Sequence, residues 1–180
     1  MDLLYPDLPL AVLRQVARSP TYAPLSSSVG RLFDAFAAAL QLSPRVQSHE
    51  GEAAMRLEAL AAQVRYPVAP YPMTPGVLID PSPLFRAWAE DKRADTAPSL
   101  MAARFHAGVA KAFANSARHL VETGAAKAVA LSGGCFQNAI LLGMTLRALD
   151  GIPVLIHRTS PANDGGLALG QALVAAAQTL

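Results

Sequence analysis

Two glycine turns in the last third of the chain constrain its fold more than any other feature. The first is Leu131–Asn138, with glycines at 133 and 134, and the second is Ser160–Leu167, with glycines at 165 and 166. Each turn follows an apolar run that predicts a strand and precedes a run that predicts a helix; the strands are 128–131 and 154–157, and the helices are 137–149 and 166–177. Two such units in succession gather backbone amides and helix N-termini in one place, a geometry that suits phosphate.

Composition narrows the class of protein. The chain has 180 residues, 52% of them hydrophobic, which is enough apolar surface for one globular domain, 1–180. Its net charge of +2 is too weak to indicate a nucleic-acid partner. The apolar stretches are short or interrupted, and the N-terminus lacks a basic and apolar leader, so we expect neither a membrane span nor a signal peptide. The single cysteine, Cys135, excludes an intrachain disulfide and favours the cytoplasm.

Helices dominate the first two thirds of the sequence. Periodic apolar residues predict helices over 9–17, 29–42, 51–64, 84–91 and 99–123. We expect hydroxyls of Ser26–Ser28 to cap the second of these helices and Pro44 to stop it. Ser99 and Gly124 are expected to cap and to close the last one.

The segment between residues 66 and 83 is rich in proline, with prolines at 67, 70, 72, 75, 81 and 83. These prolines exclude a long helix, and we predict Gly76–Asp80 as an edge strand, where proline is tolerated. Helices followed by a strand–helix–strand–helix pattern indicate an α/β domain with parallel strands. The ligand of such a domain lies at the carboxyl ends of the strands.

Five segments resemble, in order and spacing, the C-terminal part of the HypF-type hydrogenase-maturation carbamoyltransferases: Leu25–Ala35, Glu50–Glu58, Arg104–His106, Ala130–Asn138 and Pro161–Gln171. The resemblance covers nearly the whole chain, and the two glycine motifs together make it specific. It implies the second half of an actin-like, ribonuclease-H-like α/β domain, with a short parallel sheet, flanking helices and no separate second domain. Threonylcarbamoyl-transfer enzymes share that fold.

The resemblance also implies a function. The family makes carbamoyl-adenylate from carbamoyl phosphate and ATP, and passes the carbamoyl group to the C-terminal cysteine thiolate of a partner of the HypE type. Dehydration there yields the cyanide ligands of nickel–iron hydrogenase. On this basis the chain is expected to bind ATP or carbamoyl-adenylate and to partner a HypE-type protein, with no nucleic-acid or membrane partner.

The two glycine turns carry four of the expected ligand residues. Gly133 and Gly134 would let the backbone approach a nucleotide phosphate or ribose, although an ordinary strand–helix turn also uses them. Asn138 would hydrogen-bond ribose or adenine, with a capping amide as the alternative. Gly165, with its neighbour Gly166, would leave room for the nucleotide.

The other expected ligand residues carry charge or adjoin it. Asp164 resembles the family's ligand for a divalent metal, zinc or iron, but it is also a common Asp-Gly turn residue. Asp34, with Gly30 beside it, would accept hydrogen bonds from ribose, or else pair with Arg31. Glu50 and Gly51 would form the adenine-side wall, or else begin an acidic first turn.

No catalytic residue is assigned. Cys135 lies where the family usually has valine, so we expect a small buried apolar side chain there, with a nucleophile at a helix N-terminus as the alternative. His106 matches the family and is expected in helix packing or behind the site. His157 is expected in a structural or solvent-facing role, with a second metal ligand near Asp164 as the alternative.

The family's upstream pair of metal histidines, four residues apart, has no counterpart among the histidines of this chain, at 49, 106, 119 and 157. The resemblance covers only the last part of a multidomain enzyme, so we expect little catalysis by the chain alone. Two hypotheses remain: a carbamoyltransferase module completed by a separate N-terminal half, or a non-catalytic module that binds a partner or a second copy of itself.

Overall fold

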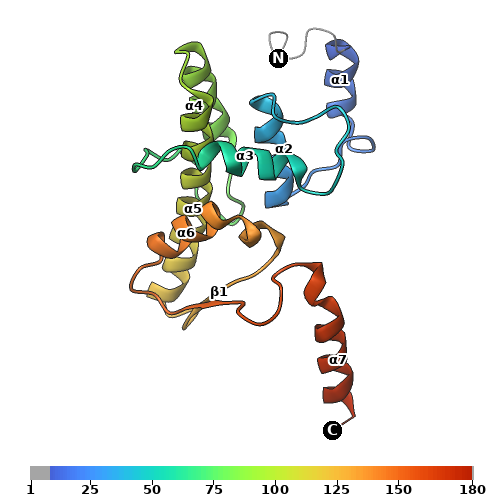
Figure 1. The fold of residues 1–180 in the computed structure, drawn as a ribbon, viewed down its shortest axis with the longest axis vertical. Coiled ribbons are helices and arrows are strands. Elements are labelled where there is room, and N and C mark those ends of the chain that lie inside the picture. Colours follow the sequence, from blue (N-terminus) through green and yellow to red (C-terminus); the bar gives the residue numbers. More distant parts are fainter. Residues whose placement is uncertain (1–8, 180) are drawn as a thin grey trace. The chain divides into compact units, whose positions relative to one another are not determined.

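The computed structural model describes residues 9–179, and Figure 1 shows the order of the elements. Seven α-helices, two strands and two short 3-10 turns follow one another as α1 (Leu10–Ala17), α2 (Val29–Ala39), α3 (Glu52–Ala61), α4 (Ser82–Arg93), α5 (Pro98–Glu122), β1 (Val129–Leu131), η1 (Gly134–Gln137), α6 (Ala139–Ala148), β2 (Val154–Ile156), η2 (Asp164–Gly166) and α7 (Leu167–Gln178). The chain forms two compact units, and the boundary between them in the sequence lies between Leu57 and Glu58. Each unit is described by itself. Among the described helices, none is long and apolar enough to cross a membrane.

The first unit is built around α2. The Ser28 hydroxyl accepts a hydrogen bond from the Arg31 amide at 3.4 Å, which confirms the predicted serine cap. The helix buries Phe33 and Phe36 on one side. It ends at Ala39, before the predicted boundary at Pro44, because Gln41 takes a left-handed conformation, with φ of 59°, that terminates the helix.

The core of the second unit lies between α5, α6 and the two strands. Buried Ala114, Leu131 and Leu149 form its centre, and half-buried apolar residues of α6 and the strands pack around them. Figure 1 shows α6 lying against α5, and this pair makes the largest set of contacts between elements. The Arg118 guanidinium of α5 donates to the backbone oxygens of Ala148, at 2.9 Å, and Asp150, at 3.0 Å, at the end of α6.

The two strands pair in parallel, as predicted, with Leu131 opposite Ile156. One face of this sheet contributes Val129, Leu131 and Val154 to the core just described. The other face is open, and Leu155 on it is 64% exposed. The prediction of a short parallel sheet with flanking helices is therefore confirmed.

Two capping predictions for α5 have different outcomes. Ser99 does not cap the helix, because the N-cap position is Ala97 and no side chain bonds there. Pro98 occupies the first helical position, where its missing N–H costs nothing and its ring presets φ. Gly124 follows the helix with φ of 76°, which confirms the predicted glycine stop.

The predicted strand at Gly76–Asp80 is wrong. The structure has only one isolated antiparallel bridge in this region, between Thr74 and Asp80. Val77 and Leu78 are exposed instead of packing on a sheet. The Asp80 carboxylate accepts hydrogen bonds from the Ser82 amide at 2.9 Å and the Ser82 hydroxyl at 2.6 Å, so it bonds to the first residue of α4.

The proline-rich segment is anchored to α4 and α5 through Tyr71. The Tyr71 hydroxyl donates to Asp91 of α4 at 2.6 Å, and Arg104 of α5 donates to the same carboxylate at 2.6 Å. The Arg104 guanidinium also lies 4.5 Å from the centre of the Tyr71 ring. Burial is the main reason that the pKa of Tyr71 is raised, so its hydroxyl stays a donor.

Gly108 is where the backbone of Tyr71 crosses α5. A Cβ at this position would lie 2.6 Å from the Tyr71 carbonyl oxygen. This oxygen belongs to the backbone, so relieving the clash would require a backbone shift that costs free energy. We therefore expect Gly108→Ala to lower the free energy of unfolding by about 1–3 kcal/mol.

Gly143 in α6 gives the matched control, because a Cβ there would meet only the flexible end of Arg147, at 3.7 Å. Gly143→Ala should raise the free energy of unfolding by about 0.5–1 kcal/mol through helix propensity. Urea denaturation of the two variants tests this contrast, and equal effects would contradict the close crossing at Gly108.

Candidate functional site

The two glycine loops lie side by side in the second unit. The Gly133 amide donates to the Ala162 carbonyl at 2.9 Å, which joins the first loop to the second. Gly133 has φ of 97°, a conformation that favours glycine. Because parallel strands end at the same edge of a sheet, the loops that follow β1 and β2 meet there.

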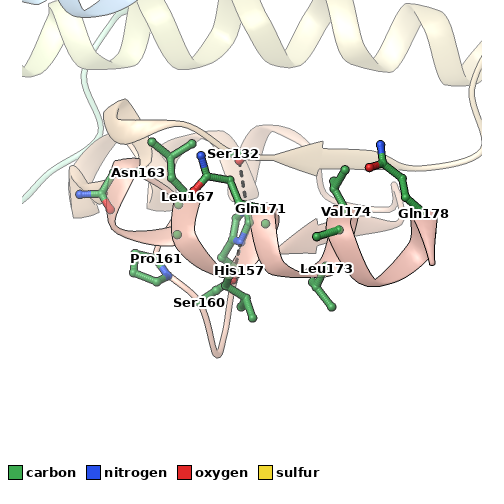
Figure 2. Close-up of a pocket in the computed structure, with 15 residues that line it drawn as sticks. Ser132, His157, Ser160, Pro161, Asn163, Leu167, Gln171, Leu173, Val174 and Gln178 are labelled. Carbon is green, nitrogen blue, oxygen red and sulfur yellow. Dashed lines mark hydrogen bonds between the residues drawn. The ribbon is translucent and has the colours of Figure 1, made fainter. Parts of the chain in front are cut away.

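A cluster of three polar side chains occupies this edge. The Ser132 hydroxyl and Nε2 of His157 are 2.9 Å apart, and Nδ1 of His157 is 3.3 Å from the Ser160 hydroxyl. Figure 2 shows both hydrogen bonds as dashed lines beside α7. Neither Ser132 nor Ser160 is among the site residues predicted from the sequence. The strand pairing explains why Ser132 and His157 meet: Leu131 lies opposite Ile156, and these two residues follow the paired strand ends.

Three of the four glycine amides of these loops donate hydrogen bonds within the protein. Besides the Gly133 amide, the Gly165 amide donates to the Asn163 side-chain oxygen at 3.1 Å, and the Gly166 amide donates to the Asn163 carbonyl at 2.9 Å. A Cβ at Gly166 would lie 2.8 Å from the Pro161 carbonyl oxygen. These three amides therefore hold the loops together, and close packing within the second loop is itself a reason for glycine at 166.

The start of α6 is also bonded within the protein. The Ala139 amide donates to the Glu58 carboxylate at 2.7 Å, and the Leu141 amide donates to the Asn138 side-chain oxygen at 2.8 Å. A carboxylate and an amide oxygen thus take two of the donors that a helix N-terminus offers. Asn138 has the capping role that the sequence analysis weighed as the alternative to a nucleotide contact.

His106 lies directly behind Asn138. It is fully buried in α5, with Nδ1 2.8 Å from the Ala102 carbonyl and Nε2 3.0 Å from Nδ2 of Asn138. The structure therefore places this histidine where the sequence analysis expected it, in helix packing behind the loop.

An open hollow of about 690 Å³ adjoins the loops, and we call it the α7 hollow. Ser132, His157 and Asn163 line its loop end, and Leu169, Leu173 and Val174 of α7 line the other. Figure 2 shows Leu173 and Val174 on α7, and Ser132 and His157 beside this helix. The hollow thus has hydroxyl, imidazole and amide groups at the sheet edge, and mainly apolar side chains with Gln171 and Gln178 along the helix.

Asp164 is exposed at the start of η2. Within residues 9–179 no three histidine, cysteine, aspartate or glutamate side chains gather in a way that could hold a metal ion. One carboxylate does not make a zinc or iron site, which needs several ligands. The described residues therefore do not fit such a metal by themselves.

The predicted ligands in the first unit have their own local roles. Oδ2 of Asp34 lies 3.8 Å from a guanidinium nitrogen of Arg31, one helical turn away. This is the ion pair given above as the alternative to a ribose contact. Gly51 has φ of 75° just before α3, and Glu50 is exposed. Glu52, which the sequence analysis did not single out, is the buried carboxylate here, and it accepts a hydrogen bond from the Ser48 amide at 2.7 Å.

Among the remaining residues, Cys135 is only half-buried in η1, where a buried apolar side chain was expected. The structure thus brings Gly133, Gly134 and the second glycine loop together. Roles for Gly30, Asp34, Glu50 and Gly51 at a nucleotide stay predictions.

Comparison with known proteins identifies the family. Residues 6–171 match the family described as carbamoyltransferase, Kae1-like domain, second subdomain. The chain belongs to the HypF carbamoyltransferase family. This membership, with the parallel sheet and its helices, confirms the actin-like α/β fold class.

Similar HypF proteins include carbamoyltransferase HypF of Rhodobacter capsulatus, which is 54% identical over 98% of this chain and 23% of its own length. HypF of Rhizobium leguminosarum bv. viciae is 41% identical over 82% of this chain and 19% of its own length. The chain therefore spans less than a quarter of these HypF relatives.

Solved HypF structures resemble this chain as well. Full-length HypF in a phosphate- and nucleotide-bound form has a TM-score of 0.73 and 34% identity, over 82% of this chain and 24% of that one. HypF of T. kodakarensis has a TM-score of 0.75 and 30% identity, over 83% of this chain and 20% of that one.

His106 should make the stability of this HypF chain depend on pH. Burial is the main cause that lowers the pKa of His106 to about 4, against about 6.5 for an unfolded histidine. As the pH falls through that window, the unfolded chain takes up a proton that the folded chain does not. The free energy of unfolding should then fall by roughly 3 kcal/mol between about pH 6.5 and pH 4.

Urea denaturation across this pH range measures the effect. His106→Gln, which cannot titrate, should show a correspondingly smaller loss. Identical pH slopes for the two proteins would contradict a buried, neutral His106.

Proposed function

We propose that this chain is the nucleotide-binding part of a carbamoyltransferase that matures nickel–iron hydrogenase. It binds ATP or carbamoyl-adenylate at the paired glycine loops and serves transfer of the carbamoyl group to the C-terminal cysteine thiolate of a HypE-type partner in the cytoplasm. One observation carries the proposal: the two loops meet at the carboxyl edge of parallel strands, in a chain similar to a HypF crystallised with phosphate and nucleotide.

The transfer step needs no nucleophile from this chain. The thiolate sulfur attacks the carbamoyl carbon, the bond from that carbon to the adenylate oxygen breaks, and AMP leaves as the thiocarbamate forms. The task for these residues is to hold the nucleotide in place.

Side chains at the loops are the groups we assign to the nucleotide phosphate. Three glycine amides already donate within the protein, so we assign the phosphate to the hydroxyls of Ser132 and Ser160 and the ring of His157, which lie together at the same edge and would exchange their mutual bonds for bonds to the ligand. Asp34 with Gly30, and Glu50 with Gly51, are assigned to ribose and adenine. Asp164 is assigned to a zinc or iron ion only where other ligands join it, and no step here depends on that ion.

Gly134 allows a direct test of nucleotide binding. A Cβ there would come no nearer than 3.9 Å to other protein atoms, so Gly134→Ala should fold normally. If a nucleotide lies against this backbone, the added methyl should weaken ADP binding by about tenfold. Isothermal titration calorimetry with ADP measures this, with Gly143→Ala as the control. Failure of the unmodified chain to bind ADP or ATP would refute the proposal.

A second candidate function is a non-catalytic module that binds another polypeptide. The supporting observation is α7, which is exposed along its length and carries four large apolar residues that are 53–62% exposed: Leu167, Leu169, Leu173 and Val174. An apolar surface of this kind is typical of an interface. Release of AMP by this chain that depends on carbamoyl phosphate would exclude a purely non-catalytic role.

For this second candidate we expect a second copy of the chain to cover α7. The wild-type chain should then sediment faster as its concentration rises, and Leu173→Asp should abolish that dependence by placing a charge in the interface. Leu120→Asp on α5 is the control, because Leu120 is similarly exposed, at 50%, but lies on another helix. A monomer at all concentrations would exclude self-association through α7.

A further inference from the structure

A continuous chain of hydrogen bonds connects α5 to the start of α6. It runs from the Ala102 carbonyl through the His106 ring and the Asn138 side chain to the Leu141 amide, with lengths of 2.8, 3.0 and 2.8 Å. His106 is fully buried, so no water competes for its ring nitrogens. Bonds of this kind in a buried setting strengthen one another.

Every proton in this chain has one consistent position. The Leu141 amide can only donate, so the atom of Asn138 facing it is the side-chain oxygen. The Asn138 nitrogen then faces His106, so Nε2 of the histidine must accept and Nδ1 must donate to Ala102. Only the neutral ring with its proton on Nδ1 satisfies both neighbours.

The arrangement fixes the orientation of the Asn138 amide. If the amide turned over, its nitrogen would face the Leu141 N–H, placing two donors together. Its oxygen would face Nε2 of His106, placing two acceptors together. A side-chain amide can make four hydrogen bonds, and the two described here leave one N–H and one lone pair for another molecule. Asn138 follows the first glycine loop, so a ligand at that loop meets those groups in one orientation.

We propose that His106 is a positioning residue for nucleotide binding: it never touches the ligand, but holds the Asn138 amide so that a fixed donor and a fixed acceptor face a nucleoside at the first glycine loop. This inference rests on the proposed function, and it adds a residue of α5 to the determinants of affinity. A leucine at 106 would fill similar space but leave the Asn138 nitrogen without its acceptor.

A double-mutant cycle on the full chain tests whether His106 acts through Asn138. His106→Leu and Asn138→Ala should each weaken ADP binding by about tenfold, measured by calorimetry at neutral pH. In the Asn138→Ala background, His106→Leu should have no further effect. His106→Gln, whose side-chain oxygen can accept from Asn138, should restore the affinity to within about twofold of wild type.

Leu84→Val is the matched control, because it removes buried volume in α4, a helix that contributes no residue to this hydrogen-bond chain. It should lower stability and leave ADP binding unchanged. Additive losses in the cycle, no rescue by His106→Gln, or an equal loss in Leu84→Val would overturn the inference while leaving the proposed function intact.

Nitrogen-15 NMR of the His106 ring gives a readout that needs no ligand. We expect a neutral ring protonated on Nδ1, and a proton on Nε2 would overturn the inference on its own. Failure of the wild-type chain to bind ADP would instead overturn the proposed function, and the ligand role of Asn138 with it.

Discussion

The packing of α6 on α5 over the two strands is the interaction on which the candidate site depends. Ala114, Leu131 and Leu149 bring one helix, one strand and the end of a second helix into a single buried cluster. This cluster fixes where β1 stops and where α6 starts, and the first glycine loop has only to span that gap. The second loop is held in turn by parallel pairing of β2 with β1 and by the bond from Gly133 to Ala162.

Elements with a strong local signal were predictable from the sequence. The alternation of apolar runs, glycine turns and helical runs gave β1, β2, α6 and α7, since each has its own periodicity and punctuation. The predicted strand at Gly76–Asp80 is absent because its apolar residues are exposed, with no sheet to pack on, and because Asp80 bonds to Ser82, the first residue of α4. Local bonds of an aspartate can thus outweigh an apolar run.

The candidate site was only partly predictable, for a different reason. Sequence spacing placed both glycine loops at one edge, but it could not show which amides would be used within the protein. Asn163 takes the amides of Gly165 and Gly166, so glycine at 166 is explained as well by packing against Pro161 as by a ligand. The bond between Ser132 and His157 joins residues 25 apart, and the bond between His106 and Asn138 joins residues 32 apart. Tertiary contacts of this range have no local signature.

Arg118 gives α6 a second attachment, at the opposite end from His106. It binds the Ala148 and Asp150 carbonyls, while His106 binds Asn138. Twelve residues of helix separate His106 from Arg118, about 18 Å, which is close to the length of α6 itself. A short helix that is fastened at both tips to a long one cannot pivot on its own. Any opening of the loop that involves α6 must therefore either carry α5 along or first detach one of these two fastenings, so the pair is expected to exchange its amide hydrogens as one cooperative block.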